Sequence, residues 1–104
     1  MLRLNLDKKT EEQFNKLLNL HSNNYSDLIK SLIDYRVHEL QKGIHNIELD
    51  FAFYEKKYNI NSKEFYTKYE NGDFGDESHN KDFMIWSSEY ESYNDFKAEL
   101  EKLA

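Results

Sequence analysis

Four histidines and a short run of carboxylates are the side chains in this sequence whose types could bind a metal ion. The histidines, at positions 21, 38, 45 and 79, include no His-x3-His pair, and the chain has no cysteine to complete a zinc site. Asp73, Asp76 and Glu77 lie around Gly75, but they do not match the spacing of a calcium-binding loop and are typical of a solvated turn. We therefore expect neither a metal nor another cofactor.

Catalytic chemistry is not indicated by the other polar residues. No nucleophile is paired with a base in a recognisable arrangement, and none of the three glycines belongs to a loop that could cradle a phosphate. We therefore predict that the protein is not an enzyme. Its function should be binding, and its charge and secondary structure should indicate the partner.

Charge is distributed unevenly along the 104 residues. Residues 1–44 carry seven Lys or Arg against six Asp or Glu, whereas residues 45–104 carry seven Lys against fourteen Asp or Glu, so the net charges are +1 and −7. This asymmetry predicts different partners for the two halves. An acidic segment that only keeps the chain soluble is the alternative, although it leaves the aromatic residues of that segment without an explanation.

One long helix over residues 24–58 is the element around which the chain is organised. Its second part has apolar residues at alternating steps of four and three, which place them on one stripe of a helix: Ile33, Val37, Leu40, Ile44, Ile47, Phe51, Tyr54 and Tyr58. Its first part has a broader apolar face, made by Leu28, Ile29, Leu32 and Ile33. Gly43 costs about 1 kcal/mol relative to alanine in a helix interior, so two helices separated there are the alternative.

The chain opens with strict alternation of apolar and polar residues, which is the period of a half-buried strand. Leu2, Leu4 and Leu6 share one face of this strand, and Arg3 and Asn5 share the other. No second convincing strand follows in the sequence. The strand should therefore pair with a second copy of the chain.

A short amphipathic helix is expected over residues 8–21, because its apolar residues fall at helical spacing: Phe14, Leu17 and Leu18. A polar turn should end it, since Asn23 tolerates the left-handed conformation that follows a helix. Asn24 is then a good N-cap for the long helix, with Asp27 at the third position of that helix.

Strand, helix, polar turn and helix within about 40 residues resemble a ribbon-helix-helix DNA-binding domain of the CopG/Arc/MetJ type. The resemblance covers residues 2–44 and is carried by LRLNLD at the start, by the apolar face of the first helix and by NYSDLIKSLI at positions 24–33. It implies that two chains form an antiparallel ribbon that enters the major groove of operator DNA.

The resemblance also implies roles for individual residues. Arg3 and Asn5 would face base edges, because these side chains can bond guanine and adenine in bidentate fashion. The other expected contacts are phosphate binding by the backbone of Asn24, Tyr25 and Ser26, and dimerisation through Leu2, Leu4, Leu6, Leu28 and Leu32. Without the resemblance, Arg3 and Asn5 form an ordinary solvated strand face.

Beyond residue 58 we expect a turn, a short helix over residues 63–70 with Asn61 or Ser62 as its cap, a loop, and a final helix over about residues 81–103. The final helix carries a continuous apolar stripe, half of it aromatic. A surface of that kind left in water marks a partner site. The alternative is that the aromatic stripes pack on each other as a small helical hairpin.

The run KEFYTKYENGDFGD, followed by DFMIW, is similar to the C-terminal extension of certain prokaryotic antitoxins whose head is a ribbon-helix-helix. This resemblance implies an arm that wraps a small basic protein toxin, often of the RelE/ParE-like group. The candidate toxin-binding residues are Phe51, Tyr54, Tyr58, Phe65, Tyr69, Phe74, Phe83, Trp86, Tyr90 and Tyr93.

The predicted fold is mainly α: a ribbon-helix-helix dimer, with one N-terminal strand and two helices per chain, followed by a long helix and a helical C-terminal arm. Residues 1–44 are the head that dimerises and binds DNA, residues 45–60 a helical extension, and residues 61–104 the acidic aromatic arm.

The expected function is that of an antitoxin and autorepressor: a homodimer that binds operator DNA and neutralises a small basic protein toxin. The alternatives are a stand-alone ribbon-helix-helix transcription regulator and a helical adaptor or assembly protein that does not bind DNA. A cytoplasmic location without a membrane segment is expected, because the start does not resemble a signal peptide and no apolar stretch approaches ~20 residues.

Overall fold

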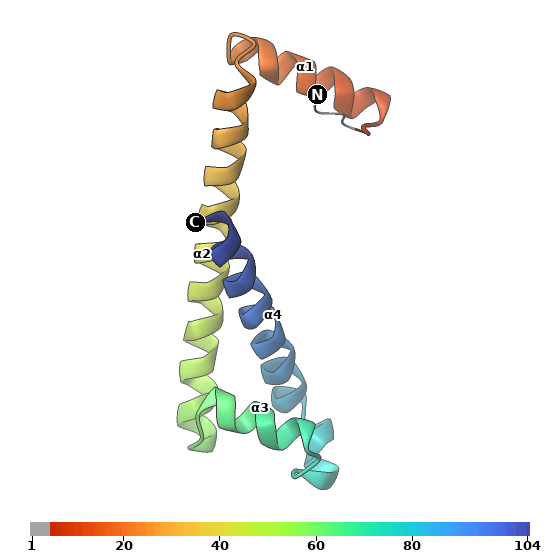
Figure 1. The fold of residues 1–104 in the computed structure, drawn as a ribbon. Helices are drawn as coiled ribbons and strands as arrows, with labels where there is room; N and C mark the ends of the chain where they lie inside the picture. The colour runs from red at the N-terminus through yellow and green to blue at the C-terminus, as the bar shows by residue number, and fades with distance from the viewer. Residues whose placement is uncertain (1–4) are drawn as a thin grey trace. The chain divides into compact units, whose positions relative to one another are not determined.

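The computed structural model describes residues 5–104 and is built from helices (Figure 1). Their order is α1 (Lys8–Leu20), α2 (Tyr25–Tyr58), α3 (Ser62–Glu70), the 3-10 helix η1 (Gly75–His79) and α4 (Lys81–Leu103). The chain divides into two compact units, an N-terminal unit (Met1–Arg36) and a C-terminal unit (Val37–Ala104). The division falls within α2, before the predicted end of the head at residue 44.

The predicted N-terminal strand, and with it the ribbon-helix-helix fold, is wrong. No strand occurs in residues 5–104, and the part of the predicted strand that is described, Asn5 and Leu6, has no regular secondary structure. Leu2, Arg3 and Leu4 lie outside the described residues. A short strand cannot satisfy its backbone groups alone, and Asp7 instead caps α1, because its carboxylate accepts a hydrogen bond of 2.7 Å from the Thr10 backbone N–H.

The turn between α1 and α2 has the predicted chemistry. Ser22 and Asn23 adopt left-handed backbone conformations, with φ of 56° and 59°, and the Asn23 N–H donates to the Leu18 carbonyl at 2.9 Å. The Asn24 side chain accepts a hydrogen bond of 3.0 Å from the Asp27 N–H. Left-handed Asn23 and N-capping by Asn24 are therefore confirmed.

Helix α2 continues through Gly43, so the alternative of two shorter helices is wrong. A Cβ atom at this position would lie 3.0 Å from Cε2 of Phe96 on α4. The glycine thus lets the Phe96 ring approach the backbone of α2.

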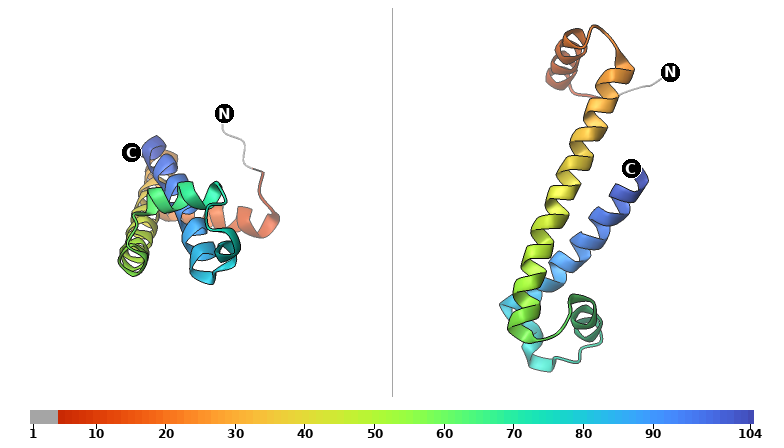
Figure 2. Two further views of the ribbon diagram at one scale, coloured as in Figure 1. Left: turned by 90° about the horizontal axis from the view of Figure 1, so that it is seen from below. Right: turned by 90° about the vertical axis from the view of Figure 1, so that its left-hand side faces the viewer.

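In the C-terminal unit, α4 returns alongside the second half of α2, and α3 lies across one end of this helix pair (Figures 1 and 2). The core between these elements is largely aromatic. Phe65 and Trp86 are fully buried, and their rings stack with centroids 3.8 Å apart and an interplanar angle of 5°. The indole N–H of Trp86 donates to Ser62 Oγ at 2.9 Å, so the buried donor is satisfied.

The N-terminal unit has a much smaller interior. Within residues 5–36, only Leu18 on α1 and Leu28 on α2 are buried. The rings of Phe14 and Tyr25 add a looser contact, with centroids 6.5 Å apart. Among the helices described in residues 5–104, none combines the length and the apolar character that crossing a membrane requires.

Candidate functional site

The ten residues predicted to bind a toxin all lie in the C-terminal unit and pack against one another. Five of them are core residues, namely Phe51, Tyr54, Phe65, Phe83 and Trp86. The other five are partly buried against that core: Tyr58, Tyr69, Phe74, Tyr90 and Tyr93. The aromatic stripes therefore cover each other within one chain, as the hairpin alternative expected. Toxin binding by these residues stays a prediction, and the fully buried Phe65 and Trp86 offer no surface to a partner in this structure.

The residues predicted to bind DNA are not brought together as a site. Asn5, Tyr25 and Ser26 are exposed, and Arg3 lies outside the described residues. At the start of α2, where phosphate binding was expected, the Asp27 carboxylate lies 3.2 Å from Nδ1 of His21. A carboxylate in the first turn interacts favourably with the helix dipole and repels a phosphate. DNA binding stays a prediction, and no described contact supports it.

The residues predicted to form the dimer differ in their surroundings. Leu28 is buried within its own chain, Leu6 is half-buried and Leu32 is exposed. The sequence placed Leu32 on a broad apolar face of α2, and the structure leaves that face largely uncovered.

Both helices of the N-terminal unit carry aliphatic side chains that are exposed in the part of the chain that the structure describes. We call these five residues the open aliphatic set: Leu17 (37% exposed), Leu20 (83%), Ile29 (40%), Leu32 (51%) and Ile33 (38%). On α2, the three members at positions 29, 32 and 33 share one helix face, since they are spaced i, i+3, i+4. Exposed apolar groups of this size mark interaction surfaces.

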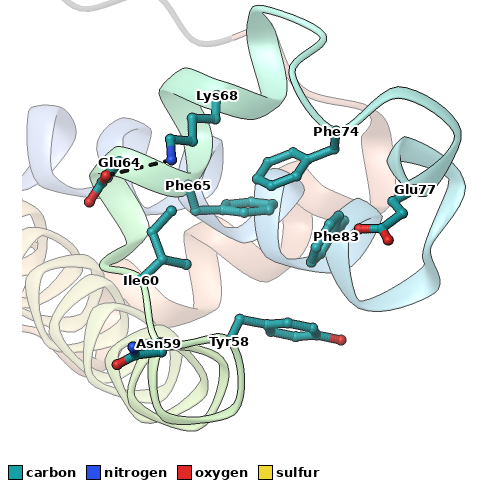
Figure 3. Close-up of a pocket in the computed structure, with 9 residues that line it drawn as sticks. All are labelled: Tyr58, Asn59, Ile60, Glu64, Phe65, Lys68, Phe74, Glu77 and Phe83. Carbon is teal, nitrogen blue, oxygen red and sulfur yellow. Dashed lines mark ion pairs between the residues drawn. The ribbon is translucent and has the colours of Figure 1, made fainter.

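A hollow of ≈ 380 Å³ opens in the C-terminal unit beside the aromatic core (Figure 3). Nine residues from the end of α2, the following turn, α3, the loop, η1 and α4 line it: Tyr58, Asn59, Ile60, Glu64, Phe65, Lys68, Phe74, Glu77 and Phe83. Sequence reasoning missed the hollow because its walls come from so many segments. The acidic residues around the aromatic Phe74 were the available signal.

One carboxylate joins the end of α2 to the start of α4. Asp82 Oδ2 accepts hydrogen bonds of 2.7 Å from both Lys57 Nζ and the Tyr58 hydroxyl. The hydrogen bond from Lys57, followed by that from Tyr58, lowers the pKa of Asp82 below its ordinary value. The same bond raises the pKa of Lys57. These bonds link the end of α2 to the start of α4.

A second contact between α2 and α4 joins two carboxyl groups. Burial, together with a hydrogen bond and charge repulsion from Asp50, raises the pKa of Glu89 to about 7. One carboxyl oxygen of Glu89, Oε2, is buried without a hydrogen-bond partner among the described residues. Nearby, the hydrogen bond of 2.8 Å to Glu91 is the main reason that the pKa of Tyr66 rises to about 12. The first pair joins α2 to α4, and the second joins α3 to α4.

Metal binding has no candidate in the part of the chain that is described, because no group of three or more His, Asp or Glu is placed to hold an ion. Comparison with protein-family models, curated proteins and solved structures gives no match to this chain. Function must therefore follow from the burial, charge and contacts of residues 5–104. The open aliphatic set and the hollow beside the aromatic core are two candidate partner surfaces.

Proposed function

We propose that this protein is a binding protein, which self-associates through its N-terminal unit and presents its acidic C-terminal unit to a basic partner protein. The open aliphatic set is the observation that carries the proposal. Within residues 5–36, five large aliphatic side chains are exposed while two are buried. A unit that exposes more large aliphatic side chains than it buries needs a second surface to cover them.

The small size of the N-terminal unit is the energetic reason to expect self-association. Ordering the backbone costs about 1–2 kcal/mol per residue, whereas complete burial of a Leu or Ile side chain contributes about 1.5–3 kcal/mol relative to its exposed state. Two buried leucines do not offset the ordering of the residues around them. Burial of the open aliphatic set against another chain supplies additional apolar contact where the unit lacks it.

Charge favours a second copy as the occupant of this surface. The N-terminal unit carries six Lys or Arg and five Asp or Glu, a net charge of +1, so two such units repel each other little. The C-terminal unit carries eight Lys and fifteen Asp or Glu, a net charge of −7. Two C-terminal units therefore repel each other, and self-association is expected at the N-terminal units.

The same negative charge indicates the chemistry of the second partner. Because the C-terminal unit completes its own core, its acidic surface is available to another protein. Complementary charge speeds association with a basic partner and disfavours acidic ones. Binding without catalysis is sufficient for this function, so we propose no enzymatic activity.

A small basic toxin is the partner that the sequence resemblance implies, and neutralisation of such a toxin in the cytoplasm is the specific form of the function that we propose. A helical adaptor would use the same two surfaces. Operator binding and autorepression remain a prediction. They rest on the sequence resemblance, whereas self-association rests on the exposure of the open aliphatic set.

The mass of the protein in solution tests the self-association. Sedimentation equilibrium of the full chain should give a dimer, and Leu32→Asp should give a monomer, because it places a charge in the proposed interface. Leu49→Asp is the matched control, since Leu49 lies on the same helix and is 57% exposed, but belongs to the C-terminal unit. A monomeric wild type, or a dimer that Leu49→Asp disrupts and Leu32→Asp does not, would contradict the proposal.

A further inference from the structure

The walls of the hollow in the C-terminal unit are mainly aromatic. Phe83 lies between Phe74 and Tyr58, as Figure 3 shows, with ring centroids 4.8 Å from Phe74 and 5.1 Å from Tyr58. Phe65 stacks on Phe74 at 5.5 Å and closes the inner side. Phe74 is only partly buried. The Tyr58 ring is already stacked on Trp86 at 5.9 Å and lies 5.4 Å from the ammonium of Lys57. Faces of aromatic rings carry partial negative charge and attract cations.

The charged side chains of the hollow add to this preference. Glu64 and Lys68 belong to α3 and form a loose pair, with Nζ 3.8 Å from Oε1 and both side chains about half exposed. Glu77 comes from η1, and within residues 5–104 its carboxylate makes no ion pair. Two carboxylates and one ammonium leave the hollow with a net negative charge. A ligand that is both flat and cationic satisfies the rings and the carboxylates together.

Arginine fits these walls better than lysine does. Its guanidinium is planar, stacks on aromatic rings and donates several hydrogen bonds in one plane, which suits the carboxylate of Glu77. The ammonium of a lysine is compact and more strongly hydrated. The volume of ≈ 380 Å³ lies within the roughly 300–1,000 Å³ of small-molecule pockets.

We propose that this hollow binds an arginine side chain supplied by a basic partner protein. The inference rests on the proposed function, because it gives the place at which the C-terminal unit would hold that partner. Glu77 bonds the guanidinium, which packs against the exposed part of the Phe74 ring. Lys68 competes with the ligand, because its ammonium already contacts Glu64 and adds positive charge to the site.

A titration of the full-length chain with a minimal probe tests the site directly. N-acetyl-arginine amide should cause saturable NMR shifts at Phe74, Glu77 and Lys68. N-acetyl-citrulline amide, which has almost the same shape without the charge, should bind at least roughly fivefold more weakly. N-acetyl-lysine amide should fall between the two, since it keeps the charge and loses the planar stacking.

Three substitutions identify the residues responsible. Glu77→Gln should weaken binding of the arginine probe roughly fivefold, because it removes the unpaired carboxylate. Asp76→Asn is the matched control: it removes the same charge from the neighbouring residue of η1, which does not line the hollow, and should change affinity less than about twofold. Lys68→Gln should tighten binding, since the competing ammonium is gone.

Several results would overturn the inference. Shifts spread evenly over all acidic residues without saturation would show only a diffuse charge effect, and equal binding of the citrulline probe would show only an apolar hollow. Binding of inorganic phosphate that Lys68→Gln abolishes would show an anion site. None of these results alters the mass measurement, so a dimeric protein that ignores the arginine probe would lose this inference and keep its proposed self-association.

Discussion

The C-terminal unit closes an aromatic core of its own, whereas the N-terminal unit, within residues 5–36, exposes five of its eight Leu and Ile side chains. The first does so with rings: Trp86 alone stacks on Phe65, Tyr54 and Tyr58. Large flat side chains can fill the space between three helices with few residues. In residues 5–36 of the N-terminal unit the two buried side chains are leucines, and the rings of Phe14 and Tyr25 make one looser contact, with centroids 6.5 Å apart. Both units therefore contain amphipathic helices, but only the C-terminal unit supplies other helices that cover most of its apolar stripe.

The largest expected effect is on stability and concerns the indole ring in the core of the C-terminal unit. Trp86→Ala should cost about 3–5 kcal/mol of unfolding free energy, because it removes a fully buried ring and leaves a cavity. Chemical denaturation followed by circular dichroism measures this loss. Met84→Ala is the control on the same helix, where the side chain is 53% exposed. A Trp86→Ala protein as stable as the Met84→Ala protein would break the comparison, since the aromatic core would then not hold the unit.

The sequence was sufficient to predict helix caps and helical stripes. Asn24 is the predicted N-cap of α2, and Asn61, one of the two predicted candidates, is the N-cap of α3. The last helix spans the predicted residues. Helix periodicity also placed Ile47, Phe51 and Tyr54 on one stripe, and all three are in the core. Capping and periodicity are local properties, so one sequence contains enough information for them.

What covers each stripe could not be predicted from the same pattern. The spacing that buries Phe51 is also present at Ile33, which is 38% exposed. A periodic pattern defines a face of a helix and leaves open whether that face meets another part of the chain or a second molecule. The alternation at the start of the chain has the same ambiguity, because a strand forms only where a partner satisfies its backbone. The hollow escaped prediction because its walls come together only in the folded unit.

An effect of intermediate size is expected at Gly43, where a substitution tests how closely α4 packs on α2 in the C-terminal unit. Gly43→Ala alone should change the unfolding free energy little, since the gain in helix propensity of about 1 kcal/mol is offset by the contact with Phe96. In a Phe96→Ala background, the same change should stabilise the protein by that amount. A double-mutant cycle by chemical denaturation measures the coupling. Equal gains in both backgrounds would show that Phe96 does not require the glycine.

The smallest expected effect is a pH dependence confined to the C-terminal unit. The pKa of Glu89 is raised from 4.5 in the unfolded chain to about 7 in the folded protein. Between these two pH values, the folded protein keeps a proton on Glu89 that the unfolded chain releases. Its stabilising contribution is therefore complete below about pH 4.5 and is lost as the pH rises through about 7. Glu89→Gln should remove this slope and stabilise the protein at pH 8 by about 1 kcal/mol or less, because solvent screens the partly exposed pair with Asp50.

Thermal denaturation at a series of pH values, with Glu48→Gln as an exposed control on α2, measures that slope. If Glu89→Gln and wild type have parallel profiles between pH 4.5 and 8, Glu89 does not carry a proton in the folded state. The N-terminal unit should contribute nothing to the difference between the two proteins, because both carboxyl groups of this pair belong to the C-terminal unit.

The concentration dependence of thermal unfolding tests the central claim most directly, namely that the N-terminal unit needs a second copy and the C-terminal unit does not. Over a roughly 100-fold range of protein concentration, the helix signal should show a transition whose midpoint rises with concentration, as mass action requires for an associating unit. Trp86 fluorescence, which reports the C-terminal core, should give a midpoint that stays constant. If neither midpoint moves, the N-terminal unit folds without a second copy and the account is contradicted. If the Trp86 midpoint alone moves, the association belongs to the other unit and the account is equally contradicted.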